Sequence, residues 1–122
     1  MLAKLVRRQQ MWLAKERGTL RKDWRGRAPI ALAFPNRYAV GMSNLGFQTV
    51  YGALNGLDGV VCERVFYPEP QDLDLVRENR GQLLSVESQR PVRDFDFLFF
   101  SISFENDYPN VIEMLVLGGL PV

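Results

Sequence analysis

The sequence contains no histidine and only one cysteine, Cys62. It therefore offers no imidazole as a general base or metal ligand, and one thiol cannot build a disulfide framework or a zinc or iron–sulfur site. The longest apolar run, residues 96–104, is far shorter than a membrane span, and the basic N-terminus lacks the apolar region of a signal peptide. We expect a cytoplasmic protein with no membrane partner, no metal site and no catalytic residue in this chain.

What the sequence does contain is enough apolar residues for one ordinary domain. The chain has 122 residues, of which 47% are hydrophobic, so it can bury a core. The net charge of +1 hides a division between two parts of the chain. Residues 1–27 hold nine Lys/Arg and two acids, whereas residues 28–122 hold six Lys/Arg and twelve acids. We therefore predict a basic helical arm at 1–27 and an acidic body at 28–122.

The basic arm has the spacing of an amphipathic helix that ends near Gly18. Its less polar face is formed by Leu2, Leu5, Val6, Gln9 and Leu13, with Trp12 beside them. Such an arm can bind nucleic acid or an acidic membrane surface. The alternative is that the arm packs across the body or a neighbouring domain, and its Trp and Leu residues favour this interpretation because they are typical packing residues.

Three apolar segments of the body predict buried strands, at residues 29–34, 59–66 and 97–104. A helix is expected after the first, capped by Ser43 or Asn44, and a short one from Asp72 to Arg80 after the second. Residues 82–92 are ambiguous between a strand and an extended crossing segment. The expected apolar helix faces are Phe47, Val50, Tyr51 and Leu54 in the first helix, and Val111, Ile112, Leu115 and Val116 in a last helix capped by Asn106 or Asp107 and ended by Gly118 and Gly119.

This order of elements predicts an α/β fold. Parallel strands joined by helical crossovers form a doubly wound, Rossmann-like sheet, here truncated, with the flavodoxin-like strand order 2-1-3. A sheet of three strands is thin and leaves an unprotected edge. We therefore expect residues 28–122 to be the first part of a longer domain, and the chain to self-associate through the exposed edge.

In such a sheet, ligands bind beyond the carboxyl ends of the strands, here between the first and third strands. Two loops should meet there, and their polar and glycine residues are the candidate cofactor-binding residues. The loop string GMSNLG lacks the Lys-Ser/Thr of a P-loop and the GxGxxG of a dinucleotide fold. The alternative is that the glycines serve the turn, Tyr38 serves the core, and the acids cap a helix. The candidates are Asn36, Arg37, Tyr38, Gly41, Ser43, Asn44 and Gly46 in the first loop, and Ser101, Ser103, Glu105 and Asn106 in the second.

Three strings, VGMSNLGFQTVY, CERVF and FSISFENDYPN, resemble the N-terminal region of a bacterial family of radical S-adenosylmethionine (radical SAM) proteins. In this family a cobalamin-binding-type domain precedes the radical domain, and the resemblance runs from about Ile30 to the last residue. It implies a following barrel whose CxxxCxxC motif binds a [4Fe-4S] cluster and S-adenosylmethionine. That motif is absent here, so the resemblance makes the protein's own radical SAM domain the expected partner.

Cobalamin domains of this type carry a DxHxxG motif after the first strand, and its histidine is the lower axial ligand. Here Pro35–Tyr38 stands at that place, so the resemblance implies that any cobalamin binds base-off, and it makes Ser101 the corrin-facing position. The implied function is a cobalamin-binding-like domain that is not catalytic in isolation. The alternative is a structural or interaction domain that has lost cobalamin and docks the radical SAM domain or another partner, such as nucleic acid through the basic arm.

Overall fold

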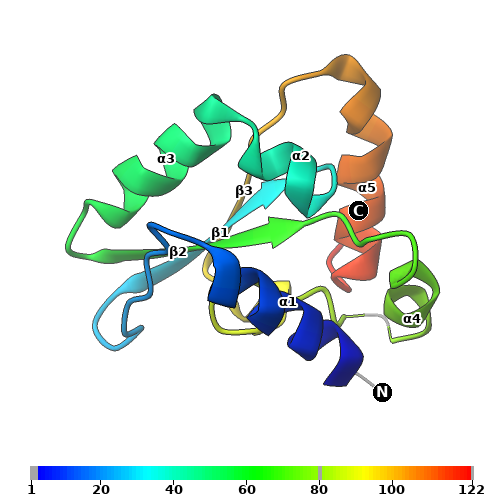
Figure 1. The fold of residues 1–122 in the computed structure, drawn as a ribbon, viewed down its shortest axis with the longest axis horizontal. Helices are drawn as coiled ribbons and strands as arrows, with labels where there is room; N and C mark the ends of the chain where they lie inside the picture. Colours follow the sequence, from blue (N-terminus) through cyan, green and yellow to red (C-terminus); the bar gives the residue numbers. More distant parts are fainter. Residues whose placement is uncertain (1–2, 80, 122) are drawn as a thin grey trace.

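The computed structural model describes residues 3–79 and 81–121, so Leu2 and Arg80 lie outside the described part. No helix in this part is both long and apolar enough to cross a bilayer. A three-stranded sheet forms the centre, and helices pack around it (Figure 1). The elements in chain order are α1 (Ala3–Lys15), β1 (Ala28–Phe34), α2 (Tyr38–Met42), α3 (Leu45–Asn55), β2 (Val60–Phe66), α4 (Leu73–Glu78), η1 (Val92–Asp94), β3 (Phe97–Phe100), η2 (Glu105–Asp107) and α5 (Tyr108–Leu117).

The sheet has the predicted parallel topology, with the order β2-β1-β3. β1 is central and is almost wholly buried because helices cover both of its faces. Alternate side chains of a strand point to opposite faces. Accordingly Leu32 and Phe34 join the core cluster that holds Phe47 of α3, whereas Ala31 and Ala33 join the cluster that holds Met114 of α5. The α/β prediction and the strand order are confirmed.

The segment after β1 is more helical than the sequence indicated. α2 occupies residues that were expected to be loop, and α3 then begins at the predicted cap, where Asn44 Oδ1 accepts a hydrogen bond from the Phe47 amide at 2.8 Å. Phe47 and Tyr51 are buried as predicted. Val50 is 41% exposed, so its assignment to the buried face was wrong. The buried face of α3 that packs on the sheet is therefore narrower than the apolar face predicted from the sequence.

The third strand is shorter and more open than predicted. It ends at Phe100 instead of Phe104, and Phe97 and Phe99 are 52% and 43% exposed. The prediction of a buried strand was wrong because only one face of β3, the face with Leu98 and Phe100, packs on the α5 cluster, while Phe97 and Phe99 on the other face are exposed.

The last helix is rotated relative to the predicted face. Met114 and Leu117 are its buried residues, whereas Ile112 is 55% exposed. The predicted glycine stop is confirmed, since Gly119 follows the helix with φ +72°, a left-handed conformation that glycine adopts without strain. Asp107 stands at the start of the helix, but its side chain makes no capping bond.

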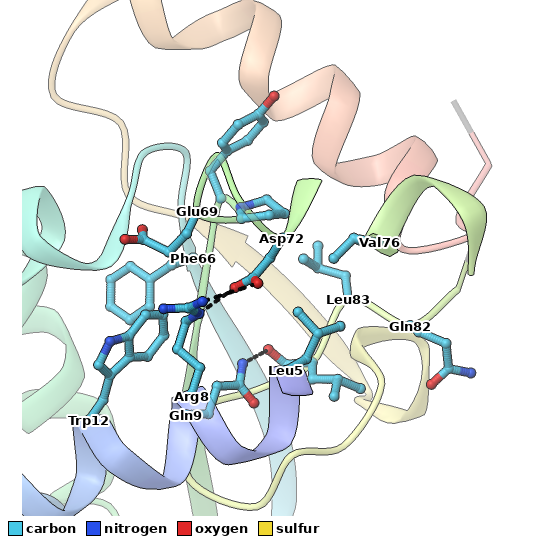
Figure 2. A pocket seen from close by; sticks show the side chains of 13 residues that line it. Leu5, Arg8, Gln9, Trp12, Phe66, Glu69, Asp72, Val76, Gln82 and Leu83 are labelled. Carbon is cyan, nitrogen blue, oxygen red and sulfur yellow. Dashed lines mark hydrogen bonds and ion pairs between the residues drawn. The ribbon is translucent and has the colours of Figure 1, made fainter. Parts of the chain in front are cut away.

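The arm packs on the body, as the alternative interpretation predicted (Figure 2). Leu5 is buried, and the Trp12 ring stacks on Tyr38 with 4.1 Å between ring centroids. Arg8 of α1 forms a 2.5 Å ion pair with Asp72. Asp72 therefore occupies the cap position of α4 but bonds to the arm instead of capping the helix, which corrects its predicted role.

Candidate functional site

The loops that follow β1 and β3 lie side by side at the carboxyl edge of the sheet. Asn44 Nδ2 donates to Ser103 Oγ at 2.9 Å, and Asn36 Nδ2 contacts Asp107 Oδ1 at 3.5 Å. Asn110, in the first turn of α5, donates to the Pro35 carbonyl at 3.0 Å. We call this region, comprising residues 35–46 and 101–110, the loop-end site. Its two loops are held together by their own side chains.

Asp107 is the most unusual member of the loop-end site. Its side chain is only 6% exposed, and its Oδ2 atom has no hydrogen-bond partner among the described residues. Buried carboxylate oxygens without a donor are costly and therefore uncommon. From the sequence, Asp107 stands in the second of the two loops expected at the crevice, where a helix cap was favoured over an acid/base pair with Glu105, and no motif marked it as a binding residue. The structure leaves it as an open acceptor at the edge where ligands of α/β sheets bind.

Two predicted site residues, Tyr38 and Gly41, make packing contacts instead of facing the loop-end site. Tyr38 stacks on Trp12 and donates to Glu16, so it belongs to the contact between the arm and the body. Gly41 is buried against Phe66 and Phe34, where a Cβ atom would lie closer than 3.0 Å to the Phe66 ring. The surroundings of Tyr38 and Gly41 are therefore those of packing residues, as the alternative interpretation expected.

The remaining candidates occupy the loop surface and the strand end. Ser43 donates to the Ala39 carbonyl at 3.0 Å, and the Ser101 amide donates to the Ala33 carbonyl at 2.9 Å, which continues the strand pairing. The other four are exposed, and they are Arg37, Gly46, Glu105 and Asn106. The structure thus brings Asn36, Asn44, Ser101 and Ser103 to one edge with Asp107.

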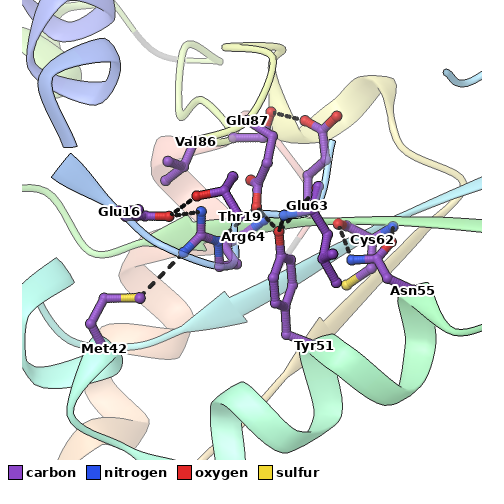
Figure 3. A network of polar contacts seen from close by, with 12 residues as sticks. Glu16, Thr19, Met42, Tyr51, Asn55, Cys62, Glu63, Arg64, Val86 and Glu87 are labelled. Carbon is purple, nitrogen blue, oxygen red and sulfur yellow. Dashed lines mark hydrogen bonds and ion pairs between the residues drawn. The ribbon is translucent and has the colours of Figure 1, made fainter. Parts of the chain in front are cut away.

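A second polar cluster, the Arg64 network, lies on the other side of β1 and comprises Glu16, Tyr51, Arg64 and Glu87 (Figure 3). Arg64 lies within β2 and is 2% exposed. Its Nε donates to Glu87 at 2.7 Å and its Nη2 to Glu16 at 2.8 Å, while the Tyr51 hydroxyl donates to Glu87 at 2.6 Å. The network therefore joins four separate segments of the chain.

The charges in the Arg64 network stabilise one another. Burial alone raises the pKa of Glu16, but hydrogen bonds from Arg64, Tyr38 and Thr19 outweigh it and hold that pKa below its usual value. Burial also raises the pKa of Glu87, while the charge of Arg64 and the Tyr51 hydroxyl favour its ionised form. A signal for this network is present in the sequence, because two charged residues, Glu63 and Arg64, interrupt an apolar strand, and a buried charge requires a partner.

The described residues contain no group of three His, Cys, Asp or Glu placed to hold a metal ion. Cys62 is fully buried, and burial raises the pKa of its thiol to about 12. The thiol is therefore protonated at neutral pH, whereas cluster ligands are thiolates.

Comparison with known families gives one match. Residues 46–122, well over half of the chain, match the family described as "Radical SAM proteins, N-terminal". The matched segment begins in the first turn of α3 and includes β2, β3 and the second loop of the loop-end site. No curated protein and no solved structure matches the chain.

Proposed function

Because this chain belongs to the family of N-terminal domains of radical SAM proteins, we propose that it is a non-catalytic domain that docks onto its protein's own radical SAM domain. In radical SAM chemistry the cluster and S-adenosylmethionine supply the radical, and a second domain contributes binding surface and orientation. The single cysteine of this chain is buried and protonated, which supports a cluster held outside it. A cytoplasmic location is part of the same proposal.

The observation that carries this proposal is the open face of β3. Phe97 and Phe99 stand side by side there, with ring centroids 6.1 Å apart, on the edge strand of the sheet. In the loop that follows β3, Ile102 and Phe104 are 38% and 62% exposed as well. Contiguous exposed apolar side chains on a folded domain mark protein contacts, and exposed aromatic residues often dominate their affinity. We call the surface formed by Phe97 and Phe99 the β3 face.

The docking proposal is tested by mixing this chain with the separately produced radical SAM domain and measuring the dissociation constant by calorimetry. Replacing Phe97 and Phe99 by serine should weaken binding at least tenfold, because two aromatic anchors are lost. Leu57→Ser is the matched control, since Leu57 is 54% exposed and lies outside the β3 face. Equal affinity of the double variant and the control would refute docking through the β3 face.

A second candidate function is cobalamin binding at the loop-end site, and the unpartnered Asp107 Oδ2 is the observation that favours it. The corrin ring carries peripheral amides whose N–H groups could satisfy this acceptor, and Ser101 and Asn36 supply further polar groups at the same edge. Without histidine the chain offers no imidazole to the cobalt, so the binding that we propose is base-off. When bound, cobalamin would supply methyl-transfer or radical-assisting chemistry.

Cobalamin binding is tested by titrating the chain with hydroxocobalamin and following the visible spectrum. Saturable base-off binding is expected, and Asp107→Asn should weaken it about fivefold because a charged acceptor becomes a neutral one. Asp58→Asn, the same change at an exposed position between α3 and β2 and outside the loop-end site, is the control. If the parent chain shows no saturable spectral change, the loop-end site does not bind cobalamin, and docking remains the function that the β3 face supports.

A further inference from the structure

A hollow lies between α3 and the segment that joins α1 to β1, next to the Arg64 network. It is bounded by residues 16–20 of this segment, by residues 47–48 and 51–52 of α3, by Met42 at the end of α2 and by Arg64 of β2. Its volume is about 190 Å³. An apolar cavity of about 150 Å³ holds one benzene molecule. The hollow therefore has room for a single ring with a small substituent, whereas a nucleotide or a corrin ring is too large for it.

The wall of this hollow is more apolar than polar, and the sequence keeps one side of it free of side chains. Phe47 and Tyr51 contribute aromatic side chains that are otherwise buried. Gly52 lies inside α3, where glycine is less favourable than alanine. A Cβ atom at Gly52 would meet no atom within 4 Å, so neighbouring side chains do not occupy this space.

Arg64 supplies the strongest hydrogen-bond donor in the wall. Its side chain is 3% exposed, and Nη2 donates to Glu16 at 2.8 Å, whereas the partner of Nη1 is the Met42 sulfur at 3.3 Å (Figure 3). Glu16 and Met42 both line the hollow, so the Nη groups are on the side of the guanidinium that faces it. A thioether is a weak acceptor, and Nη1 carries two N–H groups. The hollow therefore contains a buried donor that has no strong acceptor among the described residues.

The charges around the hollow restrict what this acceptor can be. Arg64 pairs with the carboxylates of Glu16 and Glu87, so its charge is already balanced. A carboxylate ligand would place a third negative charge beside them, and an ammonium would place a second positive charge beside Arg64. The other charged residue of the wall, Arg17, is exposed, so water solvates its charge. The acceptor that fits best is therefore an uncharged oxygen.

We propose that the hollow binds a small uncharged molecule in which a single aromatic ring carries a carbonyl oxygen. The oxygen accepts a charge-assisted hydrogen bond from Arg64 Nη1. The ring packs against Phe47, Tyr51 and the Met42 sulfur, which makes favourable contacts with aromatic rings. Apart from Met42, the wall shares no residue with the loop-end site, and it shares none with the β3 face. The site is thus additional to both proposed functions.

The test compares three probes of similar size on the whole chain: benzamide, benzylamine and benzoate. Calorimetry gives the affinities, and carbon-13 methionine methyl signals in NMR spectra give the location. We expect saturable binding of benzamide, at least tenfold tighter than the other two, because benzylamine lacks the acceptor and benzoate is repelled by the carboxylates. The Met42 methyl signal should shift. The Met114 signal should not, since Met114 is buried in the α5 cluster, away from the hollow.

Gly52→Leu should weaken benzamide binding at least tenfold, because the new side chain occupies the hollow. Ala53→Leu is the matched control, since Ala53 is the next residue of α3, is exposed and does not line the hollow. Circular dichroism checks that both variants fold, and the comparison of the three probes requires no variant. Equal binding of the three probes, equal weakening by the two variants, or no saturable binding of benzamide would each overturn the proposal.

Discussion

At the scale of single residues, the Arg64 side chain is held in place by buried partners from several segments of the chain. Its guanidinium is buried between two carboxylates, one in the segment after α1 and one in the segment before η1. Its charge lies 4.8 Å from the centre of the Tyr51 ring as well. A buried charge with good partners adds little net stability, but removing one member leaves the others uncompensated. The network therefore acts mainly by specifying where these segments meet.

Arg64→Met should lower the free energy of unfolding by about 3–5 kcal/mol, because Glu16 and Glu87 lose their shared partner inside the protein. Urea unfolding followed by circular dichroism measures the change. In the double variant Arg64→Met/Glu87→Met, part of the loss should be recovered, since one of the two stranded carboxylates is gone. Arg37→Met, at an exposed loop position, is the control. A loss below about 1 kcal/mol for Arg64→Met would show that water reaches the network.

Two helical glycines, Gly41 in α2 and Gly52 in α3, should respond oppositely to alanine. Gly41→Ala should destabilise the protein by about 1–3 kcal/mol, because the new methyl group collides with the Phe66 ring in a packed core. Gly52→Ala should stabilise it by about 0.5–1 kcal/mol, since Gly52 is exposed inside α3 and a Cβ there meets no atom within 4 Å. Thermal unfolding of both variants tests the pair, and a stabilised Gly41→Ala would contradict this packing.

At the scale of elements, α1 is attached to the body by a short row of specific contacts. Trp12 stacks on Tyr38 and packs edge-on against Phe66, whose centroid is 6.5 Å away. Glu16, just beyond the helix, then bonds to Tyr38 and Arg64. With most of its apolar face covered in this way, α1 exposes the basic side chains of Lys4, Arg7 and Lys15, together with Met11, which is 56% exposed. This basic surface keeps nucleic-acid binding open as a prediction, but insertion of the apolar face into a membrane would require the arm to leave the body.

The attachment of α1 should weaken in acid. The pKa of Glu16 lies below its ordinary 4.5 in the folded protein, so its contribution is complete above about pH 4.5 and is lost as the pH falls through the lowered value. Glu16→Gln should therefore cost about 1–2 kcal/mol at pH 7 and progressively less toward pH 3. Unfolding free energies of the parent and the variant across this range measure the difference. Glu78→Gln should show no such convergence, and a constant difference for Glu16→Gln would contradict the assignment.

The sequence predicted elements better than it predicted their surfaces. The apolar runs of β1 and β2 determined their strands within a residue, and Asn44 determined the start of α3. The spacing of apolar residues shows which side chains share one face of a helix, but not how much of that face a neighbouring element covers. Val50 and Ile112 were therefore assigned to buried faces although both are exposed. At the loop-end site, the meeting of the two loops followed from strand order. The contact of Tyr38 with the arm could not be predicted, because its partners Trp12 and Glu16 are distant in the sequence and no local pattern links them to Tyr38.

At the scale of the whole molecule, the sheet is asymmetric. β2 at one edge is covered over almost all its length, whereas β3 at the other edge is exposed on alternate residues. Edge strands with exposed apolar side chains template association with another chain. The open edge and the β3 face lie on the same strand, so a partner strand that extends the sheet lies next to Phe97 and Phe99.

In the absence of a partner, the chain should self-associate through this edge. Sedimentation velocity should show a weight-average mass that rises with concentration, and Phe99→Lys should return the chain to a monomer because a charge on the edge opposes pairing. Lysine at Leu57, which is exposed outside the β3 face, should leave the association unchanged. A parent chain that stays monomeric at high concentration would refute self-association.

The contacts of the arm also determine the order in which the molecule is assembled on the ribosome. Arg8 and Gln9 bind Asp72 and Leu84, which are 64 and 75 residues further along the chain. At about 5–20 residues per second, α1 is synthesised roughly 3–15 s before these partners. The first helix to be made is thus among the last to be docked. During that interval its apolar face, with Leu5 and Trp12, is accessible to chaperones, and mutations that slow synthesis between residues 16 and 84 would lengthen the exposure.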